Sequence, residues 1–149
     1  MSYKRILVPV DGSAVSDRGL KEALRLAREA GARVRLLHVV AEYVAYANAE
    51  AAVDIGPILE GLREGGRKTL QRIERRARVP GVRVETTLAE NPGGRVADTI
   101  VDEAKRWRAD LIVMGTHGRR GVKRMLLGSD AELVMRHTPV PVMLVPGRR

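Results

Sequence analysis

The sequence predicts an α/β fold, a parallel sheet covered by helices, and three observations support this. Short apolar runs typical of buried strands alternate along the chain with longer stretches of helical apolar period. Such alternation favours parallel strands joined by right-handed helical crossovers. The two strongest apolar runs stop abruptly at Asp11 and at Gly115. With 149 residues the chain is long enough for one full core, so we expect a single domain over residues 1–149.

The first half of the chain predicts two strands and two helices. Residues 6–10 form a short apolar strand that ends at the turn Asp11-Gly12-Ser13. Ser13 or Ser16 can cap the helix that follows, and Gly31 is suited to end it. Residues 34–40 predict the second strand, and residues 41–56 an Ala-rich, mobile or partly helical connection. A second helical face runs over 58–77, and at Gly65-Gly66 we expect a bend or close packing.

The second half predicts three strands and two helices. Residues 82–88 alternate apolar and polar side chains, which is typical of a strand at the edge of a sheet. After a turn at 91–94, residues 96–104 have the apolar stripe of a helix. Residues 111–114 form a fully apolar strand that stops at Gly115. A short helix from about Ser129 to Arg136 and a fifth strand from Val140 to Val145 complete the chain.

The segment after the fourth strand has the features of an anion site. Its glycines would let backbone N–H groups approach a phosphate, and a helix that starts near Ser129 would offer unpaired donors and a positive dipole end. An ordinary glycine-containing surface loop is the alternative interpretation. The segment is not a Walker A loop, because Arg120 occupies the place of its second glycine, and it is not GxGxxG.

The spacing Gly115-x2-Gly118-x9-Gly128-Ser129 resembles the ATP-binding motif of the universal stress protein family. VPVDGS near the N-terminus, LLHVV at 36–40 and PVPVMLV at 139–145 extend the resemblance over essentially the whole chain. It implies an open five-stranded sheet in the order 3-2-1-4-5 with helices on both faces, the adenine nucleotide alpha hydrolase-like fold. Strands 1 and 4 would then be neighbours, and Asp11 and Gly115 would face one crevice beyond their carboxyl ends.

The resemblance also implies how an adenine nucleotide would be held. Asp11 could accept hydrogen bonds from a ribose cis-diol, although capping the first helix is an alternative role. The backbone of Val39 could pair with the adenine edge, and Pro9 and Met114 would form apolar walls. The residues that match the ribose and phosphate loop are Gly115, His117, Gly118, Gly128 and Ser129, of which Ser129 could also cap the last helix.

Two residues of the motif depart from the family pattern. Asp130 and Ala131 stand where the family usually has an apolar residue followed often by Ser or Thr. A carboxylate in the first turn of a helix would compete with phosphate for the same positive end. The arginines and lysines at positions 119, 120, 123 and 124 could offset this effect. The preference among ATP, ADP and AMP therefore stays open.

Three functions are compatible with these residues. The leading one is a stress-response or signalling module, a dimeric switch that binds ATP, or AMP or ADP, with Mg²⁺ accompanying ATP. The second is a slow ATPase, but we assign no catalytic residue and find no carboxylate pair arranged for Mg²⁺. The third is a nucleic-acid or partner-binding protein, since the net charge is +9 and residues 63–78 are rich in basic side chains. Few aromatic side chains are present to stack on bases.

Compartment and assembly follow from simpler features. The absence of Cys excludes disulfides and is consistent with a reducing cytoplasm, where we expect the protein. No apolar run approaches the ~20 residues that span a bilayer, so we expect no membrane partner. His38 lies in an apolar strand and is interpreted as a hydrogen-bonded core residue rather than a ligand. The apolar strand Val140 to Val145, placed at the sheet edge by the resemblance, predicts a homodimer.

Overall fold

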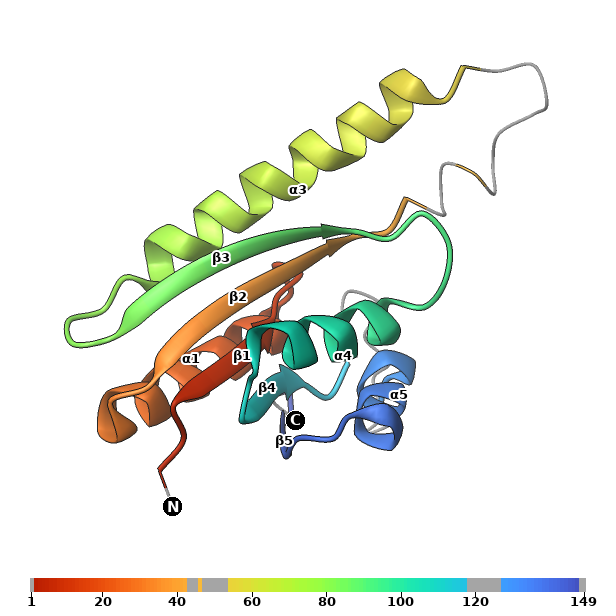
Figure 1. The fold of residues 1–149 in the computed structure, drawn as a ribbon. Coiled ribbons are helices and arrows are strands. Elements are labelled where there is room, and N and C mark those ends of the chain that lie inside the picture. Colours follow the sequence, from red (N-terminus) through yellow and green to blue (C-terminus); the bar gives the residue numbers. More distant parts are fainter. Residues whose placement is uncertain (1, 43–45, 47–53, 118–126, 148–149) are drawn as a thin grey trace.

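The structure is a computed structural model, and it describes residues 2–42, 46, 54–117 and 127–147. Five parallel strands form one sheet in the order β3-β2-β1-β4-β5 (Figure 1), which confirms the expected α/β fold and strand order. The central strand β1 (Arg5–Pro9) lies between β2 (Arg33–Val40) and β4 (Leu111–Gly115). The two edges are β3 (Arg83–Glu90), as the alternating pattern predicted, and β5 (Val142–Val145).

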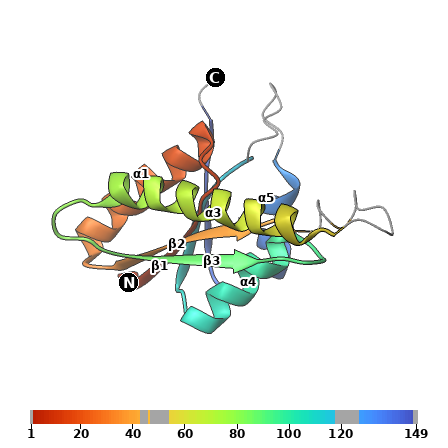
Figure 2. The same cartoon turned by 90° about the horizontal axis from the view of Figure 1, so that it is seen from above.

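Helices cover both faces of this sheet (Figure 2). On one face lie α1 (Ala14–Ala30) and α3 (Gly56–Ala77), and on the other lie α4 (Val96–Trp107) and α5 (Ser129–His137). Alternate side chains of β1 enter the two cores, since Ile6 and Val8 face α1 and α3 whereas Leu7 faces α4 and α5. Because the chain has no Phe, aliphatic side chains fill most of both cores.

Local capping fixes where α1 begins and ends. Ser13 is the N-cap, and its Oγ accepts a hydrogen bond of 3.2 Å from the Ser16 N–H. Gly31 ends the helix in the left-handed conformation, with φ of 65°. The predicted boundaries of this helix are therefore confirmed, and the turn at Asp11-Gly12 is held against its start.

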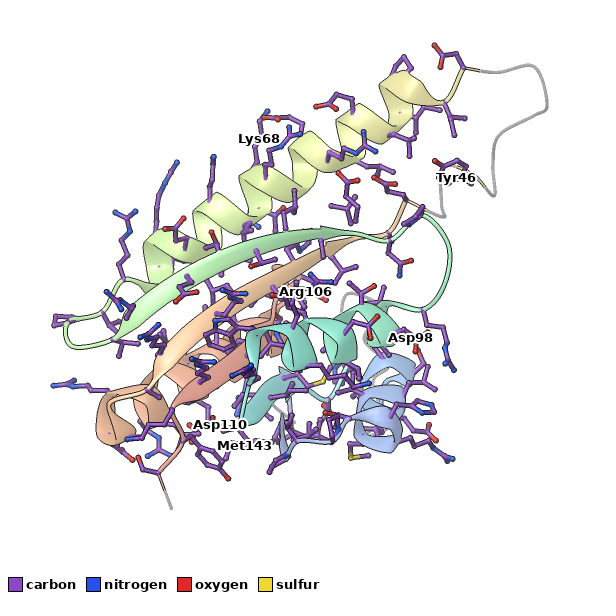
Figure 3. The ribbon with its side chains drawn as sticks, in the orientation of Figure 1. Tyr46, Lys68, Asp98, Arg106, Asp110 and Met143 are labelled. Carbon is purple, nitrogen blue, oxygen red and sulfur yellow. The ribbon has the colours of Figure 1, made fainter. Side chains whose placement is uncertain are left out.

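Asp110 holds the two central strands side by side (Figure 3). Its two carboxylate oxygens accept hydrogen bonds from the backbone N–H groups of Lys4 (2.8 Å) and Arg5 (3.0 Å). Asp110 directly precedes β4, so this contact joins the start of β1 to the start of β4. The carboxyl ends of β1 and β4 consequently reach the same edge of the sheet, where the candidate site lies.

Several predicted details need correction or completion. The fifth strand begins at Val142 rather than Val140, because pairing with β4 starts where the Pro141 carbonyl accepts from the Ile112 N–H at 3.0 Å. At Gly65-Gly66 the helix α3 is uninterrupted and Gly66 is buried, so close packing, not a bend, explains the glycine pair. Most of the 41–56 connection lies outside the described residues.

The basic segment 63–78 belongs mainly to the solvent side of α3, and Lys68 points away from the sheet (Figure 3). Arg63, Arg67, Arg76 and Arg78 each lie within ion-pair distance of a carboxylate. Across the part of the chain that the structure describes, no carboxylate pairs with Lys68, Arg72 or Arg75. In the same described part, no helix is both long and apolar enough to cross a membrane.

Candidate functional site

A cavity of about 530 Å³ opens at the carboxyl ends of β1, β2 and β4, where the starts of α1, α4 and α5 also meet. This is the edge of a parallel sheet at which connections leave in opposite directions, the usual position of a ligand site. The described residues that line it are Pro9, Val10, Asp11, Ser16, Leu37, His38, Val39, Val96, Ile100, Met114, Gly115, His117, Leu127, Gly128, Ser129, Asp130 and Ala131.

The turn after β1 orients the carboxylate of Asp11. Its Oδ1 accepts a hydrogen bond of 2.8 Å from the Ser13 N–H, and its own N–H donates to Ser16 Oγ at 3.2 Å. Gly12, between Asp11 and Ser13, has φ of 81°, a conformation that glycine adopts without strain. Asp11 therefore closes the turn, whereas Ser13 caps the helix, so the alternative role of Asp11 as helix cap was wrong.

The end of β2 presents backbone groups to the cavity. Leu37 bonds toward β1, since its carbonyl accepts from the Val10 N–H at 2.8 Å, and Val40 bonds toward β3 through Asn91. The backbone groups of successive residues in a strand point alternately to its two neighbouring strands. Val39, two residues after Leu37, therefore directs its N–H and C=O to the β1 side, just beyond the last residue of β1. An adenine edge needs one donor and one acceptor, which is what Val39 offers there.

His38 is a hydrogen-bonded residue of this same rim. Its Nδ1 lies 2.7 Å from the Val10 carbonyl, and because a carbonyl only accepts, Nδ1 carries the proton. The predicted hydrogen bond is confirmed, but the predicted position in the core was wrong. The ring is only half-buried, however, and it also lines the cavity.

Gly115 at the end of β4 and Gly128 at the start of α5 allow other parts of the protein to pack closely against them. A Cβ on Gly115 would lie 2.6 Å from Val15 Cγ1, so the missing side chain admits α1. At Gly128 a Cβ would lie 2.9 Å from the Thr116 carbonyl oxygen and 3.0 Å from His117 Cα. The Gly128 N–H donates to that same carbonyl at 2.6 Å. Gly128 therefore holds the start of α5 against the end of β4, whether or not a phosphate is bound.

Backbone donors gather at the start of α5. Gly128 is the N-cap and Ser129 the first helical residue, so the expectation that Ser129 is the cap was wrong by one position. Glu132 is the first residue of α5 whose N–H donates an intrahelical hydrogen bond, to the Gly128 carbonyl at 3.0 Å. The N–H groups of Ser129, Asp130 and Ala131 consequently have no acceptor within the helix, as at every helix start.

The charge of the described lining is negative. Asp11 and Asp130 are its carboxylates, and its other ionisable side chains are the imidazoles of His38 and His117. The pKa of Asp130 is raised, mainly because neighbouring groups displace water from its carboxyl and secondly because Asp11 adds a negative charge nearby. Since Asp130 is still exposed to solvent, water screens part of this repulsion.

The predicted site residues converge in the structure. Pro9, Asp11, Val39, Met114, Gly115, His117, Gly128, Ser129, Asp130 and Ala131 all line the one cavity. Gly118 and the basic positions 119, 120, 123 and 124 lie outside the described residues. That these residues bind a ligand stays a prediction.

Seven lining residues had no part in the predicted site: Val10, Ser16, Leu37, His38, Val96, Ile100 and Leu127. Val96 and Ile100 were interpreted as the buried stripe of a helix, and in the structure the first turns of α4 do pack on the sheet. The signal that could have placed them is their position directly after the loop that leaves β3, at the same edge of the sheet.

Comparison with known proteins is consistent with this geometry. The model of the family described as "Universal stress protein family" matches residues 2–146. A universal stress protein of Methanocaldococcus jannaschii is 38% identical over 143 residues, which cover 96% of this chain and 82% of that protein. The structure of UspA from Lactobacillus plantarum has a TM-score of 0.81 and 27% identity, covering 97% of this chain and 99% of that one. A universal stress protein from Archaeoglobus fulgidus, solved in complex with dAMP, has a TM-score of 0.64 and 26% identity, covering 97% and 99%.

Proposed function

Because the chain belongs to the universal stress protein family, we propose that it is an adenine-nucleotide-binding module of stress response or signalling. Its bound nucleotide, ATP or the less phosphorylated ADP or AMP, would report a cellular state to a partner. The observation that carries this proposal is that residues 9–11 meet residues from 114–117 and 127–131, far away in sequence, at one cavity. The dAMP complex of the related Archaeoglobus fulgidus protein supports an adenine ligand.

Each part of the nucleotide has a matching group in the cavity. The base would pair with the Val39 backbone between the apolar walls formed by Pro9 and Met114. Asp11, oriented by its hydrogen bond from Ser13, would accept from the ribose hydroxyls. The N–H groups at the start of α5 would bind the first phosphate, with His117 beside it, and the family resemblance assigns Gly118 to the same phosphate. Mg²⁺ would arrive with ATP and be held largely by phosphate oxygens and water.

The site is tested by measuring how Asp11→Asn changes the binding of adenosine and of an analogue that lacks the ribose hydroxyls. Asp11→Asn keeps an oxygen that can accept from the Ser13 N–H, so the turn is retained while the charged ribose acceptor is lost. We expect about tenfold weaker adenosine binding in calorimetry, because hydrogen bonds to a charged acceptor contribute about 1.5–3 kcal/mol. Binding of 2′,3′-dideoxyadenosine, which lacks both hydroxyls, should be nearly unchanged.

A control and an identification step complete the test. Asp17→Asn removes a carboxylate of α1 that pairs with Arg76 outside the cavity, and adenosine binding should not change. Mass spectrometry of the small molecules released from purified protein should detect an adenine nucleotide. Failure of wild-type protein to bind adenosine, AMP or ATP in calorimetry would overturn the proposal.

We also propose that the protein forms a homodimer through β5. The Pro141 carbonyl accepts from the Ile112 N–H in β4 at 3.0 Å, and the Val145 carbonyl accepts from the N–H of Thr116, directly after β4, at 3.1 Å. The backbone groups of Val142 and Leu144 therefore point to the open edge. The donor that proline lacks would face β4, so Pro141 does not protect this edge. An apolar strand with free backbone groups favours pairing with a second copy.

A further inference from the structure

We infer that the outer face of α1 and α3 binds the sugar-phosphate backbone of double-stranded nucleic acid, without regard to base sequence. This surface is separate from the nucleotide cavity, because the described residues that line the cavity include no Lys or Arg of these two helices. The inference goes beyond the proposed function and does not depend on it. Its basis is the way in which charge is divided between the two helical layers of the molecule.

The two layers of helices carry opposite net charge. On one face of the sheet (Figure 2), α1 and α3 together hold ten basic and six acidic side chains. On the other face, α4 and α5 together hold three basic and five acidic side chains, with histidine counted as neutral. The structure describes all four helices throughout, so this difference does not depend on the rest of the chain. An approaching polyanion is therefore attracted to the α1 and α3 face.

Ion pairs within the basic layer leave a particular set of cations unbalanced. Each of the six acidic side chains of α1 and α3 lies within ion-pair distance of an arginine. Five exposed cations of these helices have no carboxylate within that distance in the described part of the chain: Lys21, Arg28, Lys68, Arg72 and Arg75. The residues outside the described ranges include one acidic side chain, Glu50, which is too few to balance five cations.

Three of these cations form a row along the solvent side of α3. Lys68, Arg72 and Arg75 follow one another at steps of four and three residues, which return to the same side of a helix. Lys68 points away from the sheet (Figure 3). The row extends about 10 Å along the helix axis, a length over which a DNA duplex presents about six phosphate charges. Arg76 joins α3 to Asp17 of α1 at 2.9 Å and 3.1 Å, so the two helices form one layer.

The other side chains of this face favour a nucleic-acid duplex over an acidic protein. Protein interfaces are anchored by large apolar and aromatic side chains. Across α1 and α3, both described throughout, the one exposed large apolar side chain is Ile58, in the first turn of α3. Neither helix contains an aromatic residue, so the bases of a single strand would have nothing to stack on. The phosphates of an intact duplex require only the cations.

The test compares two double variants that each remove one Lys and one Arg. Lys68→Gln with Arg75→Gln changes the row on α3, whereas Lys105→Gln with Arg136→Gln changes α4 and α5 on the opposite face. Both lower the net charge by the same amount, and glutamine is a good helix former. Fluorescence anisotropy with a short labelled DNA duplex measures Kd over a series of salt concentrations. Thermal unfolding verifies that both variants are folded.

The expected results follow from the release of counterions by bound phosphates. Wild type should bind the duplex at low salt, with an affinity that falls steeply as salt is added. The α3 double variant should bind about tenfold more weakly at low salt, and the slope of log K against log salt should become shallower by about 2, one unit for each lost phosphate contact. The double variant on α4 and α5 should change Kd by less than about twofold.

Three results would overturn the inference. The first is a wild-type protein that does not bind the duplex at low salt. The second is equal weakening by the two double variants, which would show that net charge matters rather than this face. The third is binding of polyglutamate as tight as that of the duplex at the same salt, which would indicate an acidic protein as the partner. None of these results affects the adenosine test of the cavity, so the proposed function is judged separately.

Discussion

Arg35 connects two strands and a helix through one guanidinium group. From β2 it donates to Glu85 of β3 and to Glu103 of α4, at 2.7 Å each, and its Cζ lies 4.7 Å from the centre of the Trp107 ring. Arg106, labelled in Figure 3, donates to the second oxygen of Glu103 at 2.9 Å. Glu103 is only 2% exposed, so its charge depends on these two partners.

At the residue scale, we predict that Arg35→Ala lowers the free energy of unfolding by about 3 kcal/mol, because it leaves the buried Glu103 carboxylate short of a partner. Urea denaturation measures this change. Arg25→Ala is the matched control, since Arg25 also pairs with two glutamates, Glu22 and Glu29, but at the exposed surface of α1. The control should leave the unfolding midpoint nearly unchanged. Equal losses in both variants would contradict the prediction.

The same network predicts how this loss depends on pH. The pKa of Glu85 is lowered, mainly by the hydrogen bond from Arg35, with burial opposing it. A lowered carboxyl pKa contributes stability above the ordinary value, and the contribution is lost as pH falls through the folded-state value. The difference between wild type and Arg35→Ala should accordingly shrink in acid below the ordinary carboxyl pKa. A difference that grows in acid would exclude this role of the Arg35–Glu85 pair.

At the scale of an element, α3 contains two adjacent glycines with opposite environments. A Cβ on Gly66 would lie 2.9 Å from Val40 Cγ2, 3.1 Å from Leu88 Cδ1 and 3.2 Å from His38 Cδ2. A Cβ on Gly65 would meet nothing within 4 Å. Gly66 therefore lets α3 approach β2 and β3 closely, directly behind the histidine of the cavity rim, whereas Gly65 faces solvent.

These environments predict opposite effects of the same substitution. Gly65→Ala should raise the free energy of unfolding by roughly 0.5–1 kcal/mol, because alanine restricts the unfolded chain and favours helix. Gly66→Ala should lower it by about 1 kcal/mol, since the added methyl group would crowd the side chains of Val40, Leu88 and His38, and this overpacking outweighs the helical gain. Thermal unfolding of the two variants checks this. Stabilisation by Gly66→Ala would mean that α3 moves away from the sheet at little cost.

At the scale of the whole molecule, the sheet has one edge backed by α3 and one at β5 with outward-pointing backbone groups. Val142→Pro removes an N–H that points to the open edge and leaves the bonds between β4 and β5 in place. We therefore predict that Val142→Pro shifts the protein from dimer to monomer in light scattering at micromolar concentration. Val142→Thr, which keeps both the N–H and the branched shape, should remain dimeric. A monomeric wild type would refute the proposed dimer.

Much of this fold follows from local features of the sequence. Apolar period placed β1 and β4, and Ser13 and Gly31 fixed the ends of α1, because periodicity and capping depend on residues within a few positions of one another. The glycine spacing and its family resemblance implied the strand order and the residues that meet at the cavity. These features can be recognised in the sequence because each depends on residues within a few positions of one another or on a motif of fixed spacing.

Only the tertiary structure decided what each of these residues touches. Gly128 resembles a phosphate-binding glycine in sequence, yet its absent side chain admits the backbone of Thr116 and His117. Ile100 has the pattern of a core residue, yet it also lines the cavity. Pro141, just before β5, has no backbone N–H, but its backbone faces β4 rather than the open edge. Whether this proline protects the edge could therefore be decided only from the side of the strand that its backbone faces. Contacts of this kind join residues far apart in sequence, and their distances are set by how helices pack on the sheet, which no local pattern encodes.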